Sequence, residues 1–302
     1  MNLDFVISND VKLELSSKIY KKISVKKNFI FLNKSKTKEI KFKNNIFYIF
    51  GNINGYYDKE LNLNLLKKNK LFEIINKDKT DTLDGKFLII KILDNKKIKI
   101  LTDYYKRYEI FYFKKKEILI SSSLEPFIKK KSIIKRINNN SISHSLSIYG
   151  NRPFKEDTIY SNIQRGSFNQ TIILDNNKLF VKNKKFVPLD IYENFGKNEI
   201  DNYSSAFLNS LKFKSHKFLN VIYLSSGWDS TSILAGLIKL GKRNSIRCVI
   251  GNMKYSKKLI ANKFEIERAK KICKYFKIKL YITDFDYFRL NKTNDTDLFR
   301  FL

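Results

Sequence analysis

Short apolar runs separated by polar turns dominate the first two thirds of the chain. β-Branched and aromatic residues fill these runs, as expected for strands rather than helices. Asp94-Asn95-Lys96 and Asp175-Asn176-Asn177 interrupt them with residues typical of hairpin turns. Helical periodicity is found over residues 61–75 and 138–149. The predicted strands cover residues 5–8, 28–32, 45–50, 86–93, 98–102, 110–113 and 117–121. Many strands with a few inserted helices predict an α+β layered domain over residues 1–190.

The pattern changes after a polar stretch at residues 193–202. Apolar strands are predicted at 219–224, 246–250 and 278–282, and they alternate with amphipathic helices at 230–240 and 262–276. This alternation predicts a parallel sheet with right-handed crossovers. Residues 200–302 are therefore expected to form an α/β, Rossmann-like domain that ends before such a sheet is complete.

Composition supports a globular protein of two domains. The chain has 302 residues, of which 43% are hydrophobic, and this length suggests two cores at the usual domain size. Two cysteines, Cys248 and Cys273, fit a reducing compartment. No apolar run approaches the roughly 18 residues of a membrane span, and the N-terminus lacks the features of a signal peptide. We expect a cytoplasmic protein with no membrane contact.

The net charge of +31 raises the question of a nucleic-acid partner. The surplus is nearly all Lys, and it accompanies an excess of Asn, Ile, Phe and Tyr, a joint bias that an AT-rich coding sequence produces. No aromatic RNA-binding motif or zinc finger accompanies it, and His144 and His216 lie apart from the cysteines. The charge is interpreted as a solvated surface, so a nucleic-acid partner is not favoured.

One segment has the pattern of a binding site. Residues 224–231 read Leu-Ser-Ser-Gly-Trp-Asp-Ser-Thr, between a predicted parallel strand and its helix. A tight turn of small residues there directs backbone N–H groups and a helix dipole at one point, which suits a pyrophosphate. Asp229 could hold Mg²⁺ against the phosphates. The alternative is an ordinary turn in which Asp229 only caps the helix. Hydroxyl groups come from Ser225, Ser226, Ser230 and Thr231.

This segment resembles the Ser-Gly-Gly-x-Asp-Ser loop of the N-type ATP pyrophosphatases (PP-loop proteins), and among them the asparagine synthetases. The resemblance implies ATP and Mg²⁺ as cofactors, and formation of an acyl-adenylate that ammonia or an amine opens to an amide. Ser226 replaces the first Gly of the family pattern, and Trp228 is bulkier than usual. The residues that match the loop are Ser225, Ser226, Gly227, Asp229 and Ser230, and those that match the adenine contacts are Leu224 and Ile250.

The first domain resembles a degenerate form of the same family's class II glutaminase, which is an N-terminal-nucleophile (Ntn) domain with αββα layers. The likeness lies in Leu83-Asp84-Gly85-Lys86-Phe87, in Asp103 and in residues 120–127. The family's nucleophilic cysteine is replaced by Asn2, and its Asn-Gly oxyanion pair by Phe50-Gly51. The resemblance therefore implies a degenerate domain that does not hydrolyse glutamine.

Three functions remain open. The first is an asparagine synthase-like, ATP-dependent ligase that joins a small-molecule carboxylate to ammonia or an amine. The second is a non-catalytic or fragmentary relative with residual ATP binding, because the chain ends before the family's later Gly-rich acidic segment. The third is a PP-loop enzyme acting on tRNA, which the preceding glutaminase-like domain disfavours.

Overall fold

The structure is a computed structural model that describes residues 3–10, 12–13, 15–58, 62–94, 96–115, 117–133, 136–147, 156–168, 170–183, 196–256 and 259–286. The chain divides into two compact units. Unit 1 comprises Met1–Glu60 and Asn64–Tyr192, and unit 2 comprises Leu61–Leu63 and Glu193–Leu302. Within the described ranges, no helix combines the length and the apolar character that crossing a bilayer requires.

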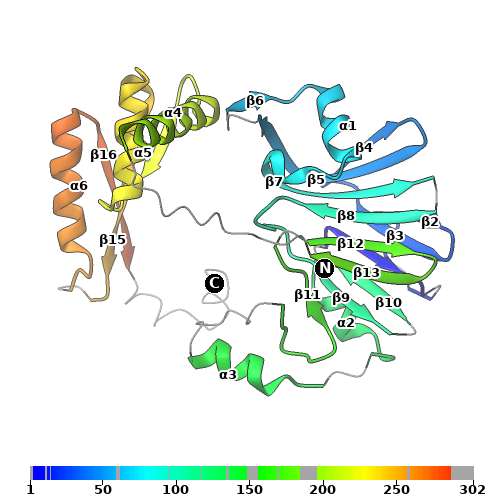
Figure 1. The fold of residues 1–302 in the computed structure, drawn as a ribbon. Helices are drawn as coiled ribbons and strands as arrows, with labels where there is room; N and C mark the ends of the chain where they lie inside the picture. Colours follow the sequence, from blue (N-terminus) through cyan, green and yellow to red (C-terminus); the bar gives the residue numbers. More distant parts are fainter. Residues whose placement is uncertain are drawn as a thin grey trace. The chain divides into compact units, whose positions relative to one another are not determined.

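Unit 1 contains two antiparallel sheets (Figure 1). The first has the order β11 (Gln164–Arg165), β9 (Phe111–Lys114), β10 (Ile118–Ser121), β1 (Phe5–Ser8), β3 (Asn28–Asn33) and β2 (Tyr20–Val25). The second has the order β13 (Lys178–Asn183), β12 (Gln170–Asp175), β8 (Lys97–Thr102), β7 (Leu83–Leu93), β5 (Asn45–Tyr57) and β4 (Thr37–Phe42), with β6 (Leu63–Leu65) beside β5.

Side-chain alternation along the strands builds a layered core in unit 1. Phe5 of β1 and Ile90 of β7 belong to one buried cluster between the two sheets. The neighbouring residues point outward, because successive side chains of a strand face opposite sides. Val6 packs with Phe127 of α2 (Glu125–Lys129), and Ile89 packs in the cluster of α1 (Lys68–Asn76). The layers are therefore helix, sheet, sheet and helix, with α3 (Asn139–Ser147) and the 3₁₀ turn η1 (Thr80–Thr82) in connections.

The mixed helix-and-strand layering with antiparallel sheets agrees with the prediction for this region, whereas its identity as an Ntn glutaminase fold stays a prediction. The predicted turn at Asn176-Asn177 is present: Asp175 pairs with Lys178, and both asparagines have positive φ. A two-residue hairpin loop of this kind is a type I′ turn.

Two predictions for unit 1 need correction. Residues 61–75 do not form one helix, because Leu63–Leu65 pairs with β5 and the helix begins at Lys68. The Leu-Asn-Leu alternation there has the period of a strand. Strands β2 and β4 were not predicted, since Lys and Glu fill most of their exposed positions and leave few apolar residues to reveal the alternation.

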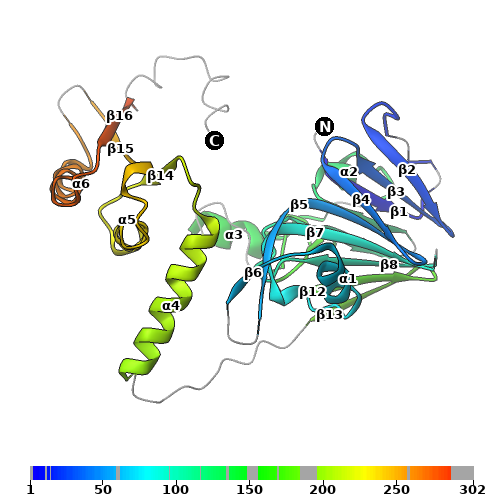
Figure 2. The ribbon, with the colours of Figure 1, turned by 90° about the horizontal axis from the view of Figure 1, so that it is seen from above.

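Unit 2 contains a parallel three-stranded sheet in the order β14 (Asn220–Tyr223), β15 (Ile246–Lys254) and β16 (Leu280–Asp286). Helices α5 (Trp228–Lys239) and α6 (Lys263–Phe276) connect the strands, with the 3₁₀ turn η2 (Arg243–Ser245) before β15. Leu234 of α5 and Ala269 of α6 share one buried cluster with Cys248 of β15. Both helices therefore cover the same face of the sheet (Figure 2). The predicted parallel alternation is confirmed; membership of the PP-loop fold stays a prediction.

The second half of the polar stretch at 193–202 belongs to α4 (Lys197–Lys214), a helix that the sequence analysis did not predict. Glu199 accepts a hydrogen bond from the N–H of Gly196 at 2.9 Å and caps the helix. The helix packs on α5 where Gly236 leaves room: a Cβ there would lie 2.5 Å from Leu211. The first turns of α4 are polar, so the sequence pattern did not indicate a helix at this place.

Candidate functional site

The loop between β14 and α5 turns the chain from strand to helix within four residues. The N–H of Leu224 donates to the carbonyl of Val249 at 2.8 Å and extends the parallel ladder past the end of β14. Ser226 then takes a left-handed conformation, with φ 61°, and its side chain is buried. Gly227 is the N-cap of α5 with extended backbone. The loop therefore delivers the first turn of α5 directly beyond the carboxyl end of a parallel strand, where ligands bind in open α/β sheets.

Backbone donors are available in the first turn of α5. In the described part of the chain, no group accepts a hydrogen bond from the N–H of Trp228, Asp229 or Ser230. The helix ladder starts only with the N–H of Thr231, which donates to Gly227 at 3.1 Å. Unpaired N–H groups and the positive end of the helix dipole lie together here, and this arrangement favours an anion.

The predicted hydroxyl groups gather around the same turn. The Oγ atoms of Ser225 and Ser230 lie 3.2 Å apart, and Ser225 Oγ also accepts from the N–H of Gly227 at 3.4 Å. Ser230 Oγ lies 3.3 Å from the carbonyl oxygen of Gly227. Thr231 Oγ1 is buried and has no hydrogen-bond partner among the residues described. Three side-chain hydroxyls are thus brought within one turn of the unpaired N–H groups.

Trp228 and Asp229, the first two residues of α5, differ in their surroundings. The Trp228 side chain is 90% exposed, so it does not fill the turn. Asp229 lines a groove of about 420 Å³ between α4 and α5, together with Phe207 and Gly236. No cluster of three or more metal-ligating side chains exists among the described residues. A Mg²⁺ ion held by Asp229 would therefore take its other ligands from phosphate oxygens and water, as this cation commonly does.

Leu224 and Ile250, the predicted adenine contacts, lie side by side: Leu224 directly follows β14, and Ile250 lies in the middle of β15, which continues to Lys254. Both belong to the core beneath α5 and α6, and their side chains are only 1% and 5% exposed. The next residue along β15, Gly251, is covered by the ring of Phe285, which would lie 2.9 Å from a Cβ at that position. Little side-chain surface is left for a base at this point, so the adenine contacts stay a prediction.

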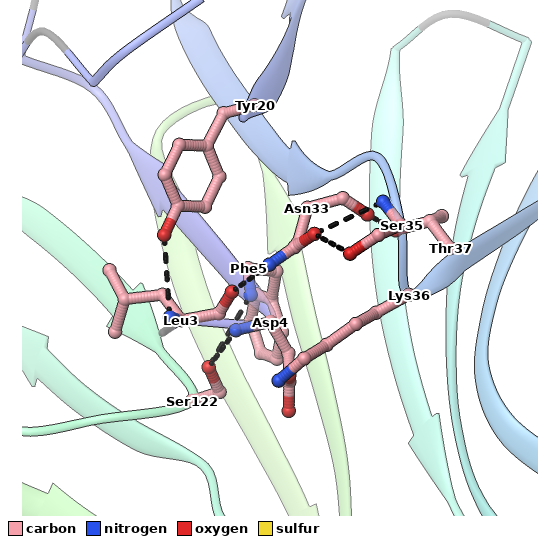
Figure 3. A network of polar contacts seen from close by, with 9 residues as sticks. All are labelled: Leu3, Asp4, Phe5, Tyr20, Asn33, Ser35, Lys36, Thr37 and Ser122. Carbon is pink, nitrogen blue, oxygen red and sulfur yellow. Dashed lines mark hydrogen bonds and ion pairs between the residues drawn. The ribbon is translucent and has the colours of Figure 1, made fainter. Parts of the chain in front are cut away.

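In unit 1, the start of the chain is held by a network of polar contacts (Figure 3). Asn33 Nδ2 donates to the carbonyl of Leu3 at 3.0 Å, and the N–H of Asp4 donates to Ser122 Oγ at 2.9 Å. Lys36 Nζ forms an ion pair with Asp4 at 2.7 Å. Asn2, the residue at the family's nucleophile position, lies outside the described residues. The network fixes the backbone of Leu3 and Asp4, which immediately follow Asn2 in the sequence.

Three of the remaining glutaminase-like residues, Phe50, Gly51 and Asp103, are closely packed in unit 1. The Phe50 side chain is buried between the sheets and carries no donor. Gly51 has φ 78°, and Tyr108 packs so closely that its hydroxyl would lie 2.7 Å from a Cβ at that position. Asp103 is 1% exposed, and its carboxylate accepts two hydrogen bonds from Arg107, from Nε at 3.0 Å and from the backbone N–H at 3.1 Å.

A cavity of about 620 Å³ adjoins this network, and the sequence analysis did not anticipate it. Four basic residues line it, three lysines and an arginine. They are separated along the chain by up to 71 positions. Because Lys is abundant throughout this protein, no local pattern distinguished these residues from other basic residues. These residues are Lys36, Lys38, Lys86 and Arg107.

Comparison with known proteins adds little to this description. No family model matches the chain, and no curated protein sequence matches it. Among solved structures, it is similar to a glutamine phosphoribosylpyrophosphate amidotransferase from B. subtilis complexed with ADP and GMP, at 8% identity and a TM-score of 0.31, over 85% of this chain and 76% of that one. A structure described as the allosteric regulatory enzyme of purine biosynthesis matches at 8% identity and a TM-score of 0.30, over 85% and 66%. A likeness of this degree establishes no function, and the proposal below is therefore argued from the residues.

Proposed function

We propose that residues 224–230 bind the triphosphate of ATP with Mg²⁺, and that the chain is an asparagine synthase-like ligase that forms an amide. The observation that supports ATP binding best is the set of unpaired N–H groups at the start of α5, next to the left-handed turn at Ser226. The exposed Trp228 side chain leaves this turn free. The ligase chemistry rests on the resemblance of the loop to the PP-loop family.

In this proposal, the loop holds the phosphates and the carboxylate substrate reacts at the α-phosphorus. The N–H groups of the first turn, with Ser225 and Ser230, would donate to phosphate oxygens. Asp229 would bind Mg²⁺, which offsets negative charge on the phosphates. A substrate carboxylate oxygen forms a bond to the α-phosphorus, and the bond to the β-phosphate oxygen breaks, releasing pyrophosphate. Ammonia or an amine then attacks the acyl carbon, AMP leaves, and the amine nitrogen loses a proton.

Ammonia or a free amine, rather than glutamine, is the nitrogen source in this proposal. Asn2 is no nucleophile for amide hydrolysis. Cys248 and Cys273 both lie buried in unit 2, and burial raises the pKa of Cys248 to about 12. Neither thiol is therefore a thiolate at neutral pH. We expect no glutamate when the protein is incubated with glutamine, and its release would contradict this part of the proposal.

A non-catalytic relative with residual ATP binding is the second candidate. The burial of Leu224 and Ile250 favours it, because a base bound there would find little apolar side-chain surface. The net charge of +31 is the one feature that favours a tRNA-acting enzyme. Pyrophosphate release from ATP that requires both a carboxylate and an amine would separate the ligase from both alternatives.

Thermal unfolding with and without Mg-ATP tests the binding proposal. A ligand at 100 times its dissociation constant adds about 2.7 kcal/mol to the free energy of unfolding, so the melting temperature of unit 2 should rise. Asp229→Ala should abolish this rise. Glu267→Ala, which removes another exposed acid, from α6, should keep it. An unchanged melting temperature at millimolar Mg-ATP would contradict the proposal, and so would a full rise in Asp229→Ala.

A further inference from the structure

We propose that the cavity of unit 1 binds the phosphate group of a phosphorylated small molecule. The cavity, of about 620 Å³, lies among the start of β4, the middle of β5, β7 and the connection between β8 and β9. A space of this size accommodates a small organic molecule. The proposal is independent of the ATP site, because every residue that lines the cavity belongs to unit 1.

Two lysines of the cavity lie on the strands that flank β5. Lys38 lies on β4 opposite Ile49 of β5, and Lys86 lies on β7 opposite Asn52 of β5. Neither lysine forms an ion pair with any described residue. Lys86 Nζ lies over the ring of Tyr108, 5.5 Å from its centroid. Both lysines line the cavity, from the two strands that flank β5.

Arg107 is oriented for recognition by contacts on one side of its guanidinium. Its Nε donates to the buried carboxylate of Asp103 at 3.0 Å, and its Nη2 donates to the carbonyl of Gly85. Nη1 has no partner among the residues described. A guanidinium fixed in this way presents its free edge in one direction, which favours bidentate contact with an oxyanion.

The acidic residues of the cavity are already paired. Asp4 binds Lys36 at 2.7 Å, and Glu109 binds Arg165 Nε at 3.0 Å. Among the described residues that line the cavity, no carboxylate is therefore left unpaired for the ammonium group of an amino acid. The charged residues of the lining and their ion-pair partners can be counted together. Two positive charges remain, because the set holds five cations (Lys36, Lys38, Lys86, Arg107 and Arg165) and three carboxylates (Asp4, Asp103 and Glu109). A phosphate monoester carries close to two negative charges at neutral pH, whereas a carboxylate carries one.

Neutral donors complete the site. Ser122 Oγ accepts hydrogen bonds from the N–H groups of Asp4 and Phe5, so its own hydrogen is left for a ligand (Figure 3). Tyr108, seated against Gly51, adds a phenol hydroxyl at the wall of the cavity. Burial, with Asp4 nearby, raises the pKa of Tyr108, so this hydroxyl keeps its proton. Cations and uncharged O–H donors together suit a tetrahedral oxyanion.

Isothermal titration calorimetry with inorganic phosphate and with glucose 6-phosphate tests this proposal, with glucose as the uncharged control. We expect both phosphates to bind at neutral pH and about 0.15 M salt, where distant lysines are screened. The double variant Lys38→Ala/Lys86→Ala should weaken binding by about tenfold or more, because charged hydrogen bonds are lost. Lys27→Ala/Lys182→Ala removes the same charge from exposed positions elsewhere in unit 1, and should change affinity by less than about twofold.

Further variants separate this site from a diffuse basic surface and from the loop of unit 2. Arg107→Lys keeps the positive charge but loses the planar guanidinium that can make two parallel hydrogen bonds, and it should weaken binding by about fivefold. Lys270→Ala, which removes a lysine of α6 outside both proposed sites, should leave the affinity for glucose 6-phosphate unchanged. Circular dichroism and thermal unfolding establish that each variant is folded. Absence of phosphate binding, equal weakening by the two double variants, or displacement of glucose 6-phosphate by glutamine would each overturn the proposal.

Discussion

The loop of unit 2 and the cavity of unit 1 both suit anions, but they are built from different parts of the chain. In unit 2, the donors are backbone N–H groups and hydroxyls within residues 225–231. In unit 1, they are long basic side chains brought together from two strands and two loops. A site built from backbone N–H groups requires small residues at consecutive positions, and these can be recognised in the sequence as a motif. A site built from side chains requires only that the fold bring distant positions together, so the sequence contains no motif for it.

The largest expected effect concerns a glycine in the wall of the unit 1 cavity. Gly51→Ala places a Cβ 2.2 Å from the carbonyl oxygen of Lys86, at a φ of 78°. Strain and overpacking together should lower the free energy of unfolding by about 3 kcal/mol. Gly241 in unit 2 also has a positive φ, but nothing lies within 4 Å of its added Cβ. Gly241→Ala should therefore cost only about 1 kcal/mol.

Urea unfolding followed by circular dichroism measures both glycine variants. The same loss in Gly51→Ala and Gly241→Ala would show that Tyr108 and the β7 backbone do not pack closely on Gly51. The cavity wall described for unit 1 would then be wrong.

A smaller effect is expected at the left-handed serine of the unit 2 loop. Ser226 has φ 61°, a conformation that costs most residues about 1 kcal/mol and costs glycine almost nothing. Ser226→Gly, which restores the family pattern, should raise stability by about that amount and keep Mg-ATP binding. Lys277→Gly, at the left-handed C-cap of α6, should stabilise unit 2 similarly without affecting ATP. Loss of ATP binding in Ser226→Gly would indicate that the serine side chain, not the turn, is required.

A pH dependence of stability is expected in unit 1. Burial lowers the pKa of Lys106 from 10.5 to about 8. Between these values the folded chain has released this proton while the unfolded chain still binds it, so stability rises with pH. The wild type should therefore gain stability relative to Lys106→Met as pH rises from about 8 to 10. Tyr48 and Tyr112, with pKa values of about 12, are common to both proteins. A constant difference in melting temperature across this range would contradict the burial of the Lys106 ammonium.

The strands that the sequence revealed are those with two apolar faces or a clear alternation. β1, β7 and β10 are buried along nearly their whole length, and their apolar runs were visible. In β2, Tyr20 and Val25 are buried while Lys21 and Lys22 are exposed, so the pattern resembled a polar loop. Partner strands, rather than local preference, place such segments in a sheet.

The candidate loop was predictable because its chemistry is local. Ser225, Gly227 and Ser230 lie within six positions, and the structure brings their polar groups together as expected. The side chain of Asp229 was not predictable to the same degree, because α4 was not anticipated and Asp229 lines the groove that α4 forms. Arg107 was missed because its role depends on Asp103 and Gly85, which the fold places beneath it.

The most direct test of the central claim is a fluorescence titration of the native chain with Mg-ATP. Trp228 is the only tryptophan of the protein, and its exposed side chain lies at the start of α5, inside the proposed phosphate loop. We predict a saturable change in Trp228 emission that Asp229→Ala abolishes and Lys38→Ala/Lys86→Ala retains. An emission spectrum that stays the same at millimolar Mg-ATP, or an undiminished response in Asp229→Ala, would contradict nucleotide binding at this loop.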